Sequence, residues 1–227
     1  FYTNIFLNIL IEYHHINKNL KNIKIKNVVE LGAGTGILAN IFLQLNKSIK
    51  YFIIDIPPTI FITVSEFEAV SQTGSKAIVR SDIRWRKNHI KSVALLGNVL
   101  LMQEARDSDA QEAILYRDEY VTEASTSNLF VIQGEKVVTP PLSDLILPGI
   151  TRHLVIEIAQ RLGISMVEDS IRVDSLPEAD GIFLSSSTRG LMPIVELDPG
   201  GRVGNGELTS LFLALRDAYD KRLRCDD

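Results

Sequence analysis

The stretch SDIRWRKNHIKSVALLGN, residues 81–98, is the most informative part of the sequence about the fold, and Lys91 near its centre is the residue with the clearest chemistry. A lysine amine attacks a carbonyl carbon only while it is neutral, and a partly buried site with other cations favours the neutral form by lowering the pKa. The same amine can also move protons once its covalent partner has left. Taken alone, Lys91 would be interpreted as a surface lysine. The residues around it and downstream therefore have to show whether it is a reactive lysine instead.

Two downstream stretches carry groups suited to an anion. In LPGITR, residues 147–152, Pro148 sets the start of a helix and Gly149 frees the backbone, so the next two N–H groups face an anion at a helix N-terminus. In SSST, residues 185–188, hydroxyl and amide groups follow an apolar strand and can donate to a phosphate. The alternative for the first stretch is an ordinary helix cap.

Four groups of residues around Lys91 closely resemble the catalytic-lysine region of one enzyme family: Asp82–Trp85, His89–Ser92, Leu95–Asn98 and Gln103–Ala105. The family is the class IV aminotransferases, which use pyridoxal 5'-phosphate. The D-amino-acid type is the better match, ahead of branched-chain aminotransferases and aminodeoxychorismate lyases. The resemblance covers about residues 75–227. It implies an α/β fold, in which a mixed sheet forms the pseudo-barrel of a fold-type IV C-terminal domain. It also implies transamination between a D-amino acid, such as D-alanine, and a 2-oxo acid.

The same resemblance assigns roles to individual residues. Lys91 would hold the cofactor as a Schiff base and shuttle the proton. Glu123, within VTEAS at 121–125, would keep the pyridine nitrogen protonated so that the ring accepts carbanion density. The other assigned residues are Arg84 near the phenolic oxygen, Leu147 against the ring, and Ile150, Thr151, Ser187 and Thr188 around the phosphate. Arg189-Gly190 departs from the polar and acidic residues expected next, which leaves the substrate side of the site less well defined.

The first 60 residues carry a different motif. The stretch ELGAGTG, residues 30–36, follows an apolar strand and opens a helix, and its glycines let the backbone turn tightly beside a ligand. Asp55 ends the next strand, where its carboxylate can accept hydrogen bonds from ribose hydroxyls. The stretch resembles the S-adenosylmethionine loop of class I methyltransferases and, with the residues around Asp55, is similar to sugar O-methyltransferases. The loop residues implied are Glu30, Gly32, Gly34, Gly36 and Asp55.

An S-adenosylmethionine-dependent O-methyltransferase fragment is therefore the alternative function. One β-α-β unit supplies too few strands for a doubly wound sheet, which favours a relic without function.

Composition changes between the two parts. All 13 arginines lie between Arg80 and Arg224, whereas 8 of the 12 asparagines and 13 isoleucines lie in the first 60 residues. Folding does not demand such a division, so we interpret it as the joining of two genes of different base composition. The predicted organisation is a partial methyltransferase-like β-α-β segment at 1–66, a linker at 67–78 and an aminotransferase C-terminal domain at 79–227. Because the family's smaller N-terminal domain is not recognisable, we expect weak turnover. A chimeric, non-catalytic chain is a further alternative.

The bulk composition excludes several classes of protein. A net charge of −4 and 45% hydrophobic residues give no reason to expect nucleic acid or a membrane as partner. Cys225 is the only cysteine, which excludes a disulfide framework and fits a reducing cytoplasm. His14-His15 lacks a third ligand, so no metal site is expected. The apolar first ten residues lack a basic leader and are too short to span a bilayer. The resemblance adds a homodimer with small-molecule substrates.

Hydrophobic periodicity predicts the secondary structure coarsely. Residues 2–19 have apolar side chains at helical spacing, and residues 27–56 indicate a strand, a helix and a strand. The second part should form two hairpins, a further strand and two helices. The predicted strands cover residues 112–116, 120–122, 128–132, 136–139 and 180–185, and the predicted helices cover residues 151–162 and 208–222.

Overall fold

The computed structural model describes residues 5–12, 59–66 and 73–224. The chain divides into two compact units, residues 1–69 with 91–93, and residues 70–90 with 94–227. In the first unit, β1 (Ile5–Glu12) pairs antiparallel with β2 (Thr59–Glu66).

The helix predicted over residues 2–19 is therefore wrong for residues 5–12. Their sequence, IFLNILIE, is rich in isoleucine, and pairing with a second strand overrides the helical spacing of the apolar residues. The elements predicted between residues 27 and 56 lie outside the described residues. The same holds for Glu30, Gly32, Gly34, Gly36 and Asp55, so the S-adenosylmethionine loop stays a prediction.

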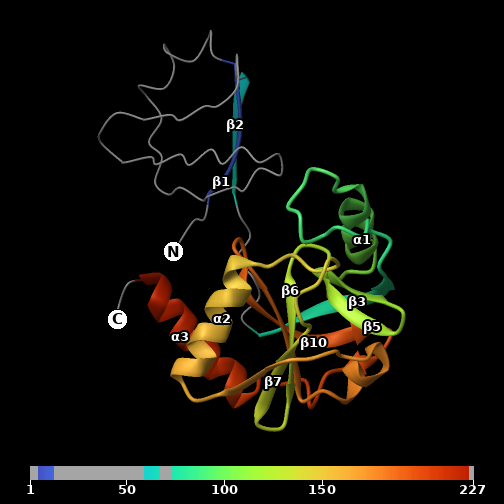
Figure 1. Ribbon diagram of the computed structural model, residues 1–227, viewed down its shortest axis with the longest axis vertical. Coiled ribbons are helices and arrows are strands. Elements are labelled where there is room, and N and C mark those ends of the chain that lie inside the picture. The colour runs from blue at the N-terminus through green and yellow to red at the C-terminus, as the bar shows by residue number, and fades with distance from the viewer. Residues whose placement is uncertain (1–4, 13–58, 67–72, 225–227) are drawn as a thin grey trace. The chain divides into compact units, whose positions relative to one another are not determined.

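The second unit is built on a nine-stranded mixed sheet with the order β5-β4-β3-β10-β9-β6-β7-β8, and β11 pairs with β10 (Figure 1). Neighbours in the order β4-β3-β10 are parallel, as are β7 and β8, and the other pairs are antiparallel. The strands are β3 (Ser75–Ser81), β4 (Glu112–Arg117), β5 (Tyr120–Ala124), β6 (Asn128–Gln133), β7 (Lys136–Thr139), β8 (Ser165–Glu168), β9 (Gly181–Ser186), β10 (Gly190–Asp198) and β11 (Gly201–Arg202).

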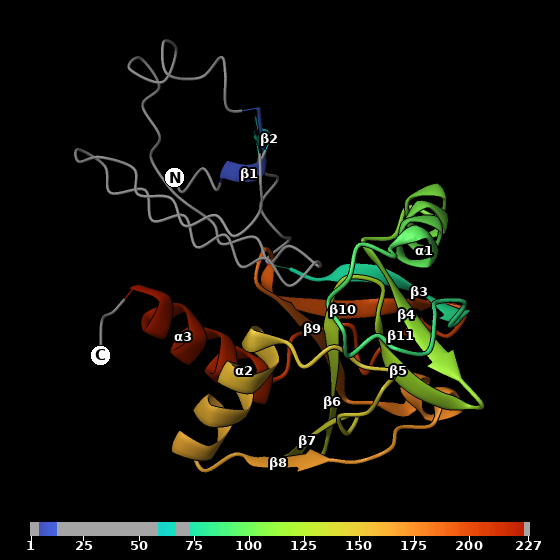
Figure 2. The same cartoon turned by 45° about the horizontal axis from the view of Figure 1, so that its top comes forward.

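Three α-helices accompany this sheet: α1 (Leu96–Asp107), α2 (Ile150–Arg161) and α3 (Ser210–Arg224), with a 3-10 turn at Val173–Glu178. Figure 2 shows α2 and α3 side by side on one side of the sheet, and α1 beside β3 and β4. None of the helices in the described part of the chain is long and apolar enough to cross a membrane.

Side-chain alternation along the central strands divides the core. Along β6, Leu129 and Val131 join one apolar cluster with side chains of β3, β4, β5, β9 and β10. Phe130 points the other way, stacks on Phe183 at a centroid distance of 4.8 Å and lies under α2 and α3 with Phe212. Because both faces of β6 and β9 are buried, the residues at their ends are held in fixed positions.

The strands and helices predicted after residue 110 are confirmed to within two residues at each end. The strands β3, β8 and β10 and the helix α1 were not predicted. Helix α1 buries Leu101, Met102 and Ala105 but exposes Leu96 and Val99, so its apolar residues occupy both sides and give no clear period.

Candidate active site

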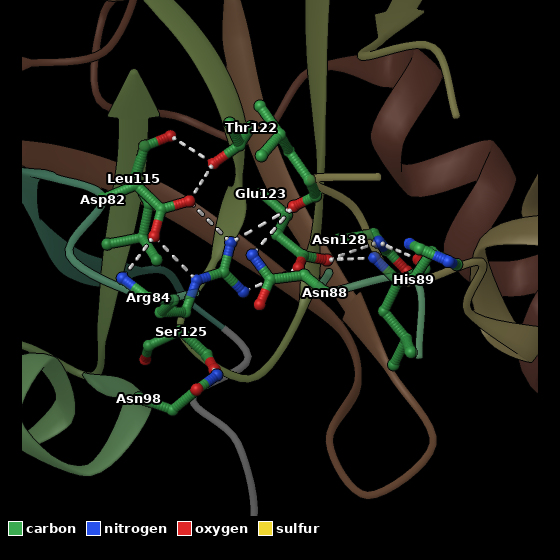
Figure 3. Close-up of polar contacts among 12 residues, drawn as sticks. Asp82, Arg84, Asn88, His89, Asn98, Leu115, Thr122, Glu123, Ser125 and Asn128 are labelled. Carbon is green, nitrogen blue, oxygen red and sulfur yellow. Dashed lines mark hydrogen bonds and ion pairs between the residues drawn. The ribbon is translucent and has the colours of Figure 1, made fainter. Parts of the chain in front are cut away.

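The carboxyl group of Glu123 is the centre of a buried network at the end of β5. Its Oε1 accepts a hydrogen bond from Arg84 Nη1 at 2.7 Å. Its Oε2 accepts one from Asn128 Nδ2 at 3.0 Å and one from the backbone N–H of Leu147 at 3.2 Å. Figure 3 shows the side chains of Arg84 and Asn128 converging on Glu123. Glu123 is only 4% exposed, so these three donors replace the water that it loses on folding.

Arg84 lies between two carboxyl groups. Its Nε and Nη2 each donate to Asp82 at 2.9 Å, and its backbone N–H donates to Asp82 Oδ1 at 3.0 Å. Thr122 Oγ1 donates to Asp82 Oδ2, and Arg117 donates to the carbonyl groups of Asp82 and Arg84. The turn forms because an Asp that follows a strand readily accepts from the backbone two residues on. The two-pronged bond with Asp82 fixes the guanidinium and directs Nη1 at Glu123.

The two carboxyl groups respond differently to burial. For Asp82, burial raises the pKa, but the hydrogen bonds and charge of Arg84 outweigh it, and the pKa lies below its usual value. For Glu123, burial raises the pKa to about 7, although Arg84 and the Leu147 N–H act in the other direction. Asp82 contributes to that rise because its negative charge faces Glu123. Glu123 is therefore a carboxyl group that can gain or lose a proton near neutral pH.

The segment before α2 packs closely on this network. Leu147 is half-buried, and its carbonyl accepts from Asn128 Nδ2 at 2.8 Å. A Cβ on Gly149 would lie 2.1 Å from Asn128 Oδ1, so this position requires glycine because of the close approach. No side chain caps the N-terminus of α2. Ile150 is exposed there, whereas Thr151 is buried and hydrogen-bonded to Tyr219 of α3. The backbone N–H groups of the first turn of α2 thus begin beside Asn128.

The serine-rich stretch forms the end of β9 and the turn into β10. Ser187 is exposed and Thr188 is half-buried in that turn, where Thr188 Oγ1 lies 3.5 Å from Ser186 Oγ. Ser185 lies directly opposite Asn128 in the pairing of β6 with β9, so both side chains project from the same face. Within the described part of the chain, Ser185 Oγ is buried and has no hydrogen-bond partner. An unpaired buried hydroxyl beside the network is a candidate donor to a ligand.

The structure thus brings Arg84, Glu123 and Leu147 together through direct hydrogen bonds. Lys91 is exposed in the loop between β3 and α1 and is grouped with the first unit, so its role stays a prediction.

Comparison with known proteins places this arrangement in a family. The model of the family described as "Amino-transferase class IV" matches residues 8–197. The chain belongs to the class IV aminotransferases.

Relatives of this aminotransferase chain include a D-alanine aminotransferase of Bacillus licheniformis, which is 39% identical over 139 residues, or 61% of this chain and 49% of the relative. A D-alanine aminotransferase of Listeria monocytogenes is 34% identical over 200 residues, or 84% of this chain and 68% of the relative. The chain thus spans about half to two thirds of the relatives it matches.

Among solved structures, the branched-chain aminotransferase of the archaeon Thermoproteus uzoniensis with norvaline is 29% identical. Its TM-score is 0.63, and the match covers 73% of this chain and 58% of that chain. A second branched-chain amino acid aminotransferase, complexed with N-(5'-phosphopyridoxyl)-L-glutamate, is 26% identical with a TM-score of 0.67, and the match covers 75% of this chain and 58% of that chain. The mixed sheet and helices of this chain match the fold-type IV C-terminal domain, so the fold class is confirmed. The family match begins at residue 8, earlier than the resemblance around Lys91, and the division at residues 67–78 stays a prediction.

Sequence reasoning gave no role to several residues of this candidate site. Asp82 was part of a recognised motif, and its place two residues before an arginine was the available signal. Asn128 opens β6, and the sequence analysis placed it only at the start of the strand predicted over residues 128–132. Tyr219 carried no sequence signal, because burial of a polar side chain against a distant helix depends on the topology.

Proposed function

We propose that this class IV aminotransferase chain carries a pyridoxal 5'-phosphate site for transamination between a D-amino acid, such as D-alanine, and a 2-oxo acid. The observation that carries the proposal is the buried carboxyl group of Glu123, held by Arg84, Asn128 and Leu147. The D-alanine aminotransferases among the relatives support the substrate class, and the solved relative with a phosphopyridoxyl ligand supports the cofactor.

The donors and acceptors of the described residues fit such a cofactor. Glu123 offers a carboxyl group for a ring N–H, and its raised pKa would fall once a positive charge lies against it. The uncapped N-terminus of α2, with the N–H groups of Ile150 and Thr151, suits a phosphate dianion. The unpaired hydroxyl of Ser185 adds a donor on the face that it shares with Asn128.

Each proposed residue has a physical task. Pyridoxal 5'-phosphate, when bound, would supply an electron sink for the substrate's α-carbon. The amine of Lys91 would attach the cofactor covalently through the cofactor's carbonyl carbon. After the substrate's amine had displaced it, the lysine amine would move a proton from the substrate's α-carbon to that cofactor carbon. Ser187 and Thr188 would donate to the phosphate, and Leu147 would pack against the ring. Arg84 keeps its predicted place near the phenolic oxygen as part of this proposal, together with its observed bond to Glu123.

We further propose that the chain forms a homodimer in the cytoplasm. The loop before α1 and its first turns expose Ile83, Leu95, Leu96, Val99 and Leu100, each at least 48% exposed. Apolar side chains gathered in this way favour a protein partner, and a second copy of the chain would bury them. Sedimentation analysis of the chain and of Leu96→Glu tests this: a dimer that dissociates in the variant supports it, and a monomer in both contradicts it.

The proposed site is tested by titrating the purified chain with pyridoxal 5'-phosphate, reducing with borohydride and mapping the labelled peptide. A visible absorption band and a label on Lys91 alone support the proposal. No band, or label spread over several lysines, contradicts it. The rate of D-alanine transamination is measured in the same samples, and rapid turnover would contradict the expectation of weak activity.

A further inference from the structure

Glu112, the first residue of β4, is a fully buried carboxylate outside the network around Glu123. It is 0% exposed. Its Oε1 accepts from Ser125 Oγ, and its Oε2 accepts from Thr126 Oγ1 and, at 3.2 Å, from Ser127 Oγ. Burying an ionised carboxylate is costly unless such donors surround it, and an ionised carboxylate is the one side chain that can accept from all three hydroxyls at once. One side chain therefore holds three consecutive residues.

These three residues are the whole connection between β5 and β6. Glu123 lies just before the connection and Asn128 just after it, and their side chains are joined by the 3.0 Å hydrogen bond. The backbone adds further ties, because Ala124 N–H donates to the Ser127 carbonyl at 2.7 Å and Ser125 N–H donates to the Ala113 carbonyl at 2.9 Å. The course of this connection sets how Glu123 and Asn128 face each other.

The hydroxyl groups of Ser125, Thr126 and Ser127 would otherwise be natural phosphate donors. A carboxylate directly against them argues for another role, because two anions cannot share the same donors without repulsion. Arg189, in the turn after Ser187, donates to the Gln111 carbonyl at 2.9 Å, and its Nη1 lies 4.0 Å from Glu112 Oε2. The carboxylate thus also has a cation within electrostatic range.

We propose that Glu112 is a positioning residue: by holding the hydroxyls of the β5–β6 connection, it fixes Glu123 and Asn128 in the geometry that binds the cofactor ring. The expected effect on cofactor binding rests on the proposed function, whereas the restraint of the β5–β6 connection by Glu112 does not depend on it. Glutamine at this position would keep one acceptor oxygen and replace the other with an NH2 group. Hydroxyls that donate to the carboxylate would then have to turn and accept in weaker, neutral hydrogen bonds. The connection would then lose its common anchor.

The test compares the full chain with Glu112→Gln and with Glu135→Gln, a control that makes the same chemical change at an exposed turn residue. Hydrogen exchange of the peptide covering residues 124–129 reports on the connection without any cofactor. Titration with pyridoxal 5'-phosphate gives the dissociation constant, and the pH dependence of the bound absorption band reports on the ring contact. We expect Glu112→Gln to speed exchange in this peptide, to weaken binding about tenfold and to shift the pH dependence of the band. The control should match the parent.

Unchanged exchange in residues 124–129, or an equal acceleration throughout the second unit, overturns the proposal, because Glu112 would then act only on global stability or not at all. Thr126→Val, which removes a single donor at an exposed residue, gives the same comparison if Glu112→Gln does not fold. If the parent chain itself binds no pyridoxal 5'-phosphate, the proposed function fails, and the exchange comparison alone decides on Glu112. Faster exchange confined to residues 124–129 then supports the restraint by Glu112, and unchanged exchange in these residues refutes it.

Discussion

Replacing Glu123 with glutamine removes a titrating group whose burial makes stability depend on pH. In the folded chain, burial raises the pKa of Glu123 from 4.5 to about 7. Between these two pH values the folded state keeps a proton that the unfolded state releases, so the free energy of unfolding falls as pH rises. At about 1.36 kcal/mol for each pH unit, the difference amounts to about 3 kcal/mol between pH 4.5 and full ionisation.

The assay is urea unfolding of the parent chain and of Glu123→Gln at pH 5, 6, 7 and 8, without cofactor. The pKa of Asp82 lies below its usual value, so Asp82 stays ionised in both proteins over this pH range, and the pH dependence of the difference between the two free energies reports on Glu123. We expect the parent to lose about 2.5 kcal/mol relative to the variant between pH 5 and pH 8, because part of the effect is already lost at pH 5.

A difference that stays constant with pH would refute the reasoning. A difference of the opposite sign would also refute it, because the charge of Arg84 would then control Glu123 more strongly than burial does. Glu135→Gln at an exposed turn serves as the control and should show no such trend.

Three further perturbations test the network and the lysine. Arg84→Met removes the cation that is bonded to two buried carboxyl groups and should cost about 3–5 kcal/mol in urea unfolding. Arg172→Met also breaks two carboxylate pairs, but at the surface, and should change little; equal losses would disprove the role of burial. Gly149→Ala forces Cβ against Asn128 Oδ1, 2.1 Å away, and should lower stability by about 1–3 kcal/mol in thermal unfolding, whereas an unchanged midpoint would mean that the segment adjusts freely. Lys91→Ala should abolish borohydride-dependent labelling with pyridoxal 5'-phosphate, and persistent labelling at one other lysine would identify that residue as the attachment site.

The elements that could be predicted from local sequence are those bounded by clear turn residues. The β6–β7 hairpin was predicted because Gly134 separates two apolar runs, and α2 because Pro148-Gly149 precedes an amphipathic pattern. The strand β10 was missed because it contains Pro193, which cannot donate to a neighbouring strand. The structure accommodates it beside a register irregularity between Ile194 and Glu196, a detail that local pattern cannot supply.

The candidate site, too, could be predicted only in part from the sequence. The resemblance named Glu123 and Leu147, and the structure joins them by a hydrogen bond, while their roles toward a cofactor stay a prediction. The resemblance gave no sign that Asn128 would bridge them, or that Arg84 would bind Glu123 across 39 residues of chain. Such contacts depend on how the sheet brings β3, β5 and β6 together, and no periodicity within one segment contains that information.

Burial keeps the pKa of Glu123 raised although its carboxyl group is bonded to an arginine, and the charge of Asp82 adds a smaller contribution. A guanidinium 2.7 Å from Glu123 would by itself favour the ionised form strongly. Asp82 takes two of the guanidinium nitrogens, and its negative charge offsets part of the effect of Arg84, while the burial of Glu123 outweighs the rest. Glu123 is thus oriented by Arg84 but not fully neutralised by it. A carboxyl group in that state responds most strongly to a further positive charge, which is the property that a protonated ring nitrogen would use.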